Sequence, residues 1–577
     1  MIKLMPYLKP YKWAVIVAIL FVFLQSLANL YLPTLMADIV DTGIVKGDMA
    51  YIYKVGIYML LVTLLAGAFT AVSNYLASKA ASGFGRDVRN SMFAHVESFS
   101  LKEFDQIGTS SLITRATNDI AQIEQVWMMI LKMMAMAPLM CIGGIIMAVN
   151  KDAKLSLVLV VAVPILIIII ALLGKTAVPI FKRIQKKLDR MNLVLREQLT
   201  GIRVLRSFNR EHYERERFDK ANQDVTDISI RINKIMAAAM PLMMLIMNLA
   251  TVAIVWFGGL RIDSGEMQVG DLMAFIQYAM QIMFSVLMGA MMFIMIPRAQ
   301  VSAVRVNEVM AIESDVCDGE TTVTSGDTDR AATVCFDHVT YHYPGAENPA
   351  VSDLSFTALP GQTTAIIGGT GSGKSTILNL IPRFFDADSG KVTINGLDVQ
   401  SWSLDDLRQQ IGYVPQKIQL FKGTIAENIR YGKPDATEEE IHEAARIAQA
   451  DGFIRKTENG YDASLVQGGK NFSGGQKQRL AIARALVRKA TIYLLDDSFS
   501  ALDYRTDAAL RAELQKITRK ATVLIVAQRV STVLHADKIV VLDDGMIVGI
   551  GTHEELMQSC TVYQEIVASQ LNKEELA

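Results

Sequence analysis

The chain has 577 residues, which is too long for one compact core, so we expect two or more domains. Its net charge of −1 argues against a protein that binds nucleic acid by neutralising phosphates, and we expect no such partner. Apolar residues make up 51% of the chain and charged residues only 20%.

Six apolar segments in the first half of the chain predict membrane-spanning helices. Each approaches or exceeds the roughly 20 residues that a helix needs to cross a bilayer. The first segment is too long for a signal peptide and has no small-residue cleavage site, so it is expected to be an anchored span. The six segments are 13–36, 52–77, 127–149, 154–174, 236–260 and 269–297.

Positive residues gather in two long connections, 79–118 and 175–234, whereas the other connections are short and of mixed charge. The positive-inside rule therefore predicts that both termini and both long connections are cytoplasmic. Apolar residues at helical spacing in these connections predict that the membrane helices continue into the cytoplasm. Each pair of helices should turn at a short element, one near 104–112 and one near 207–218.

Some residues within the spans leave two interpretations open. Lys132 either extends to the membrane interface or has a function in the membrane. Amides such as Asn29, Gln277 and Gln281 either line a cavity or bond between helices, and interhelical bonding is the favoured interpretation. The methionine clusters of the third, fifth and sixth spans either form an adaptable apolar pocket or pack as ordinary lipid-facing and core residues.

An acidic segment rich in Thr and Gly, 313–332, predicts a linker between a membrane domain at 1–312 and a second domain at 333–577. Near the start of the second domain, "AIIGGTGSGKST" reads as a strand, a glycine loop and a helix. The loop N–H groups would wrap phosphates, Lys374 would reach the β and γ phosphates, and Ser375 would ligate Mg²⁺. ATP and Mg²⁺ are therefore the predicted cofactors. The residues of this loop are Gly368, Gly371, Ser372, Gly373, Lys374, Ser375 and Thr376.

Two further motifs complete the pattern. "TIYLLD" is a strand-like run ending in Asp496, which is suited to the Mg²⁺ shell. In "NFSGGQ", Ser473, Gly474 and Gly475 open an amphipathic helix, whose N-terminus is a second anion site. Because one small domain does not need two phosphate cradles for one ATP, the second would serve a nucleotide held by another chain.

With these motifs in this order, the chain resembles ATP-binding cassette (ABC) exporters of the half-transporter kind. The resemblance implies an all-α transmembrane domain of six helices with long cytoplasmic extensions, followed by an α/β P-loop ABC nucleotide-binding domain. It also implies that Tyr343 stacks on adenine and that Gln416 is the Q-loop glutamine linking Mg²⁺ to the membrane half. The family's signature motif corresponds to Phe472, Ser473, Gly474, Gly475 and Gln476, and its D-loop ends at Asp503.

The chain departs from the family at two catalytic positions. Asp497 stands where the family has a catalytic glutamate, and Gln528 where it has a switch histidine. Asp is shorter than Glu by one C–C bond, about 1.5 Å, and about 1 Å of misplacement can cost roughly 100-fold in rate. Gln528 can donate a hydrogen bond but cannot become cationic. We therefore expect slow hydrolysis; the alternative is that an adjusted backbone lets Asp497 serve well enough.

An intact signature beside an altered acid and switch resembles the degenerate-site subunit of bacterial heterodimeric multidrug exporters. The implied partner is a paralogous half-transporter that carries the consensus glutamate and histidine. The implied function is export of small amphipathic compounds across the bacterial cell membrane, in contact with its lipids. A lipid flippase and a nucleotide-gated regulatory subunit that does not pump remain as alternatives.

Overall fold

The computed structural model describes residues 1–319, 321 and 332–570, which form two compact units. The first unit contains Met1–Glu97 and Thr109–Ile312, and the second joins Ser98–Gly108 to the chain from Glu313 onward. Within the linker expected at 313–332, residues 320 and 322–331 lie outside the described residues.

The first unit is helical, and its described residues contain six helical stretches that are long and apolar enough to cross a membrane. Each has 42 to 53 residues, about twice the length that a bilayer requires. The prediction that the spans continue as helices beyond the apolar segments is therefore confirmed. The helices are α1 (Lys12–Asp38), α2 (Met49–Glu97), α4 (Thr109–Thr114), α5 (Ile120–Met129), α6 (Ala135–Lys151), α7 (Leu157–Thr200), α8 (Ile202–Ser207), α9 (Glu211–Asp263) and α10 (Val269–Met310).

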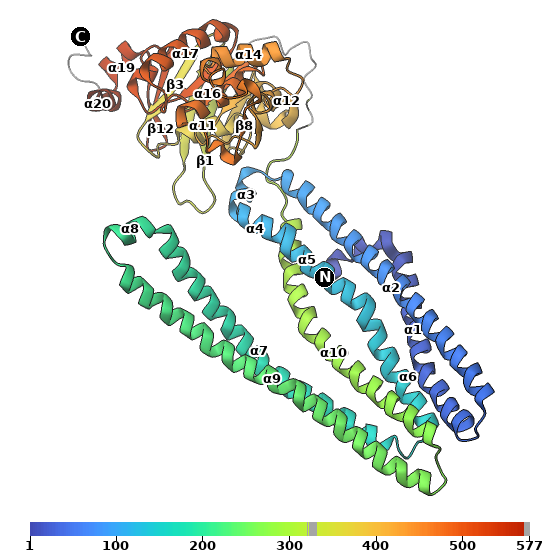
Figure 1. Cartoon of the computed structure of the whole chain (residues 1–577). Helices are drawn as coiled ribbons and strands as arrows, with labels where there is room; N and C mark the ends of the chain where they lie inside the picture. The colour runs from blue at the N-terminus through green and yellow to red at the C-terminus, as the bar shows by residue number, and fades with distance from the viewer. Residues whose placement is uncertain (320, 322–331, 571–577) are drawn as a thin grey trace. The chain divides into compact units, whose positions relative to one another are not determined.

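Short segments of other helical geometry continue or connect these helices. They are η1 (Ile2–Tyr11), η2 (Ile39–Ile44), η3 (Arg115–Asp119) and η4 (Ile130–Met134). Figure 1 shows α7 and α9 side by side and joined through α8 at one end. Lys132 lies within η4, a π-helical stretch between α5 and α6.

The first predicted turn lies where expected, and the second lies earlier than expected. Helix α3 (Leu101–Ile107) ends at Gly108, whose φ of 79° is a left-handed conformation that favours glycine, within the predicted 104–112. The second turn occupies α8 and the residues up to Arg210, so the prediction of 207–218 was wrong for 211–218, which are helical in α9. Glu211 and Glu214 in the first turn of α9 favour helix there through the helix dipole.

The interior of the first unit is a core shared by α1, α6, α7, α9 and α10. Tyr278 is fully buried in it; its hydroxyl donates to Leu30 O at 3.0 Å and lies 2.7 Å from Thr34 Oγ1. Gln281 Nε2 donates to Asn29 O at 3.4 Å, so this glutamine does bond between helices, as the favoured interpretation predicted.

The described residues of the second unit form three sheets. One is antiparallel, in the order β2 (Val351–Ala358), β1 (Val334–Tyr341), β4 (Ser389–Ile394), β5 (Leu397–Asp398). The largest has the order β12 (Met546–Gly551), β11 (Lys538–Asp543), β3 (Thr363–Gly368), β10 (Thr522–Val526), β9 (Ile492–Asp496), β6 (Ile411–Val414). Its strands are parallel except for β12, and β7 (Gly423–Thr424) pairs with β8 (Ser464–Leu465).

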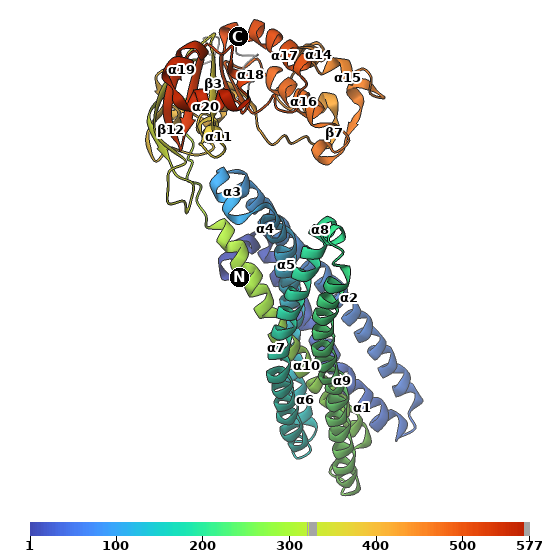
Figure 2. The same ribbon diagram turned by 90° about the vertical axis from the view of Figure 1, so that its left-hand side faces the viewer.

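The helices of the second unit surround these sheets, and Figure 2 shows α14, α15 and β7 grouped on the side away from β12. All five residues of β9 and all five of β10 are buried, as expected for central parallel strands covered on both faces. Besides α3, the described α-helices of this unit are α11 (Lys374–Leu380), α12 (Leu404–Gln409), α13 (Ile425–Arg430), α14 (Glu438–Ile447), α15 (Asp451–Ile454), α16 (Gly474–Leu486), α17 (Tyr504–Ile517), α18 (Val530–Val533), α19 (His553–Ser559) and α20 (Thr561–Gln570).

A buried acid in the first unit gives a test of its packing. Asp119 is almost fully buried and accepts hydrogen bonds from Arg305 at 2.5 Å and Ser302 at 2.9 Å. We expect Asp119→Ala to destabilise the unit by about 2 kcal/mol, because two bonds are lost while the half-exposed Arg305 keeps its hydration. The control is Glu308→Ala, which removes an exposed partner of Arg115 and should change stability by less than ~0.5 kcal/mol. Equal shifts of the two denaturation midpoints in detergent would contradict this expectation.

Candidate functional site

The glycine loop between β3 and α11 requires its glycines. Gly371 and Gly373 have φ of 87° and 89°, and a Cβ on Gly373 would lie 2.4 Å from Ala350 O. Lys374 is buried, and its Nζ donates to Gly368 O at 3.0 Å and Gly369 O at 2.5 Å. Burial lowers the pKa of Lys374. The loop thus holds a partly desolvated ammonium group against its own backbone, an arrangement suited to a phosphate.

An acid from β9 meets the loop at Ser375. Ser375 Oγ donates to Asp496 Oδ1 at 3.0 Å, and Asp496 is 3% exposed. Burial raises the pKa of Asp496, the neighbouring Asp497 raises it further, and the Ser375 bond and the Lys374 charge oppose these effects. A hydroxyl and a carboxylate at this distance fit Mg²⁺, which prefers oxygen ligands and would relieve the electrostatic strain on Asp496. Ser375 and Asp496, with Gln416, are the residues that would hold it.

Asp497 and Gln528, where the sequence analysis expects departures from the family, contact each other. Asp497 has a φ of 46°, a left-handed conformation that Asp tolerates better than most residues, and its N–H donates to Val526 O at 3.0 Å. Gln528 Nε2 donates to Asp497 Oδ2 at 3.1 Å. Gln528 therefore occupies one carboxylate oxygen of Asp497.

Gln416 joins the same group of residues. Its backbone lies close enough to Asp496, and its side chain close enough to Asp497, to lower the pKa of each carboxyl. Burial raises the pKa of Asp497, whereas bonds from Gln416 and Ser500 and the charges of Arg529 and Lys374 lower it. The fold thus brings together Lys374, Ser375, Gln416, Asp496, Asp497 and Gln528.

Tyr343 lies beside the glycine loop in an aromatic cluster. Its ring packs edge-on against Tyr341 and Phe385, with centroids 5.2 and 5.7 Å away. Its hydroxyl is 3.1 Å from Thr376 Oγ1, and the side chain is partly exposed. The aromatic residue expected to contact adenine therefore adjoins the helix that follows the loop.

The signature residues form a separate local structure at the start of α16. Ser473 caps the helix: Gln476 N–H donates to Ser473 Oγ at 3.3 Å, and Ser473 N–H donates to Gln476 Oε1 at 2.9 Å. Phe472 packs against Phe453, and Asp503 caps α17 by accepting from Thr506 N–H at 2.9 Å. These hydrogen bonds stay within the two turns and do not join the group around Asp496.

Two glutamines that the sequence analysis missed hold this site together. Gln478 on α16 is buried; its Nε2 donates to Asp497 O at 3.4 Å, and its Oε1 accepts from Ala501 N–H at 3.1 Å. Gln570 on α20 donates to Gln528 O and accepts from Val530 N–H, both at 2.8 Å. Gln478 could have been found from the sequence, because it is a polar residue on the otherwise apolar face of α16. Nothing in the sequence marks Gln570.

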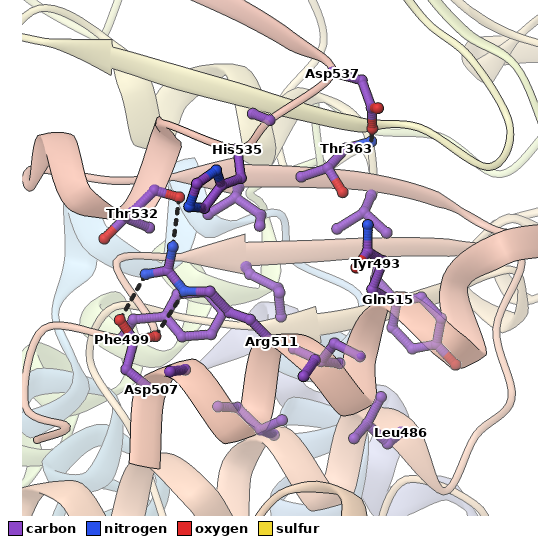
Figure 3. Close-up of a pocket in the computed structure, with 18 of the residues that line it drawn as sticks. Thr363, Leu486, Tyr493, Phe499, Asp507, Arg511, Gln515, Thr532, His535 and Asp537 are labelled. Carbon is purple, nitrogen blue, oxygen red and sulfur yellow. Dashed lines mark hydrogen bonds and ion pairs between the residues drawn. The ribbon is translucent and has the colours of Figure 1, made fainter. Parts of the chain in front are cut away.

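A cavity of about 830 Å³ lies beneath α17 and contains none of the predicted site residues (Figure 3). Figure 3 shows Arg511 pointing toward Asp507 and Thr532. Its guanidinium forms bonds of 2.8 and 2.7 Å to Asp507 and donates to Ser531 O at 3.1 Å and Thr532 O at 2.8 Å. Arg511 therefore ties the helix after the D-loop to the segment after Gln528, and its charge is already balanced.

Comparisons with known proteins agree with this geometry. Residues 15–286 match the family model of the ABC transporter transmembrane region, and residues 351–500 match that of the ABC transporter. An uncharacterized ABC transporter ATP-binding protein of Mycobacterium tuberculosis is 45% identical over 98% of this chain and 97% of its own length. The chain belongs to the ABC transporter family.

Other relatives and a solved structure place this ABC transporter among the exporters. An uncharacterized ABC transporter ATP-binding protein of Bacillus subtilis, YfiB, is 39% identical over 99% of both chains. An ATP-dependent lipid A-core flippase of Vibrio parahaemolyticus is 30% identical over 98% of this chain and 96% of its own length. The solved structure of a bacterial Atm1-family ABC exporter with ATP bound superposes with a TM-score of 0.80 at 26% identity, covering 97% of this chain and 99% of that one. The chain is thus an ABC exporter half-transporter, with the fold class predicted from its sequence.

The signature glycines of this half-transporter differ in the space around them. A Cβ on Gly475 would lie 2.8 Å from Ala501 O, whereas a Cβ on Gly474 would meet only Ala501 Cβ at 3.6 Å. We expect Gly475→Ala to destabilise the full chain by about 1–3 kcal/mol, because backbone must move. Gly474→Ala, the matched control, should be neutral or slightly stabilising, because Ala favours helix. Thermal unfolding of the two variants in detergent measures the difference, and the reverse order would contradict the described packing.

Proposed function

We propose that this chain is one subunit of a heterodimeric exporter that uses ATP to move small amphipathic compounds out of a bacterial cell. In this proposal its own ATP site is degenerate, and its signature motif completes the competent site of a paralogous partner. The observation that carries the proposal is the hydrogen bond from Gln528 Nε2 to Asp497 Oδ2, which joins the two altered positions.

The two altered residues and the hydrogen bond between them oppose hydrolysis in three ways. A general base must offer a free oxygen to the attacking water, and one oxygen of Asp497 is already an acceptor for Gln528. The shorter side chain also sets the carboxylate back by about 1.5 Å, which is enough to slow the reaction strongly. Because Gln528 is neutral and lacks a titratable ring, it cannot supply positive charge to the γ-phosphate.

The ATP-binding roles are retained in the proposal. Lys374 and the glycine loop hold the phosphates, Tyr343 stacks on adenine, and Ser375, Gln416 and Asp496 hold Mg²⁺. The signature and Asp503 face the partner's nucleotide. The proposed domain boundaries are a transmembrane domain at 1–312, a linker at 313–332 and a nucleotide-binding domain at 333–577. The chain lies in the bacterial cell membrane, and both of its termini face the cytoplasm.

A lipid flippase is the second candidate, because the chain is 30% identical to lipid A-core flippases over nearly its whole length. Both candidates share the ATP chemistry and differ in the substrate. Two measurements with the same vesicles separate the two candidate functions. One is uptake of drug-like compounds, and the other is translocation of labelled lipids. A nucleotide-gated subunit that does not pump would move neither the drug-like compounds nor the lipids against a gradient.

Asymmetry between the two ATP sites is the first consequence to test. We expect Asp497→Ala to leave transport by the heterodimer largely intact, because the competent site lies with the partner. Replacing the partner's catalytic glutamate should abolish turnover. The measurement is ATPase activity and transport by the reconstituted pair. Loss of ATPase activity from Asp497→Ala alone would refute the degenerate-site proposal.

The second consequence to test is coupling between Asp497 and Gln528. The background is a pair whose partner carries Glu→Gln at its catalytic position, so that rapid turnover is lost and any slow residual ATP turnover belongs to this chain's loop. We expect Asp497→Glu combined with Gln528→His to raise that turnover on the order of tenfold or more. Each single change should raise this turnover far less, because it leaves the other altered residue, Gln528 or Asp497, unchanged beside it. Additive effects of the two single changes would show that the hydrogen bond does not couple them.

A further inference from the structure

A pocket of about 320 Å³ lies between α6, α9 and α10 in the membrane unit (Figures 1 and 2 show these helices). This volume is near the lower end of the ~300–1,000 Å³ typical of small-molecule sites. Methionine side chains are flexible and polarisable, so such a wall adapts to apolar bodies of different shape. Five methionines line the pocket: Met136, Met140, Met247, Met280 and Met288.

One polar atom of a lining residue has no hydrogen-bond partner among the described residues. Gln281 lines the pocket, and its Nε2 donates to Asn29 O, but its Oε1 is buried and accepts no hydrogen bond from the described residues. The other polar lining residue, Ser285, uses its hydroxyl proton on Ile282 O at 2.7 Å. A buried acceptor without a donor is unfavourable, so a ligand that brings one donor would gain both the bond and the relief of that penalty.

The lining also restricts the charge of the ligand. None of the residues that line the pocket is ionisable. The nearest ionisable residue along α6 and η4 is Lys132, a basic residue four positions before Met136. Within a membrane a cation needs a counter-charge, and no lining carboxylate supplies one. The pocket therefore favours neutral molecules.

We propose that this pocket is a substrate site for small neutral apolar molecules that carry one hydrogen-bond donor, which binds to Gln281 Oε1. The inference rests on the proposed export function and narrows its substrate class. The methionines supply the adaptable apolar contact, and the glutamine selects for an N–H or O–H group.

The test compares two probes with the full pair in lipid nanodiscs without ATP. N-phenyl-1-naphthylamine is neutral, has a single N–H and fluoresces in apolar surroundings; its N-methyl analogue lacks the donor. Gln281→Met removes the acceptor at similar volume. We expect it to weaken binding of the N–H probe by about tenfold and to leave the N-methyl probe within about twofold. Naphthylmethylammonium should fail to displace the N–H probe.

Two matched variants control for indirect effects. Gln277→Met makes the same change on α10 at an exposed position outside the pocket lining and should leave both probes unaffected. Met280→Trp fills the pocket from a position that is 39% exposed, and it should weaken both probes. Equal effects of Gln281→Met on the two probes, an effect of Gln277→Met as large as that of Gln281→Met, or displacement by the cation would overturn the proposal.

Binding and transport are separable in this design. Because binding is measured without ATP, probes that bind through Gln281 but are never transported would leave the pocket standing and refute export of such compounds. Probes that are transported equally by the wild-type and Gln281→Met pairs would refute the pocket and leave the export function standing.

Discussion

Strand β10 sets the geometry on which the ATP site depends. It lies between β3, which leads into the phosphate loop, and β9, which ends in Asp496. At its end, Val526 O accepts the N–H of Asp497 at 3.0 Å, and Ala527 N–H donates to Ile366 O at 3.2 Å. The next residue is Gln528. One strand end therefore fixes Asp497, the glycine loop and Gln528 relative to each other, and a hydrogen bond between Gln528 and Asp497 follows from that spacing.

Two polar side chains, buried Gln478 and partly buried Arg511, extend this constraint to the rest of the nucleotide unit. Gln478 connects the signature helix with the backbone of Asp497 and the D-loop, and Arg511 connects the D-loop helix with the segment after Gln528. In the proposed pair, the surface that serves the partner's ATP is thus bonded to the site that holds this chain's own. Nucleotide held without hydrolysis at one site would then keep the signature helix placed for the other.

Local patterns predicted the parts of the molecule whose chemistry depends on residues that are adjacent in the sequence. Glycine spacing predicted the loop around Lys374, an apolar run predicted the strand that ends at Asp496, and span length predicted six long helices. The second cytoplasmic turn was placed too late, because the dense charges of 211–218 resemble a loop although they form helix in α9. Gln570 was missed because its role depends on α20 reaching Gln528 across 42 positions of sequence. The Gln281 oxygen, which has no partner among the described residues, likewise depends on how three helices pack, and no local sequence pattern predicts that.

The fate of the γ-phosphate at this chain's site distinguishes an asymmetric pair from two equivalent sites most directly. The reconstituted pair would be loaded with photoreactive 8-azido-ATP labelled at either the α or the γ phosphate, allowed many turnovers with Mg²⁺, and then cross-linked. A degenerate site retains both labels on this chain, while the partner retains the α label and loses the γ label. Loss of the γ label from this chain at the rate of overall turnover would contradict the asymmetric pair.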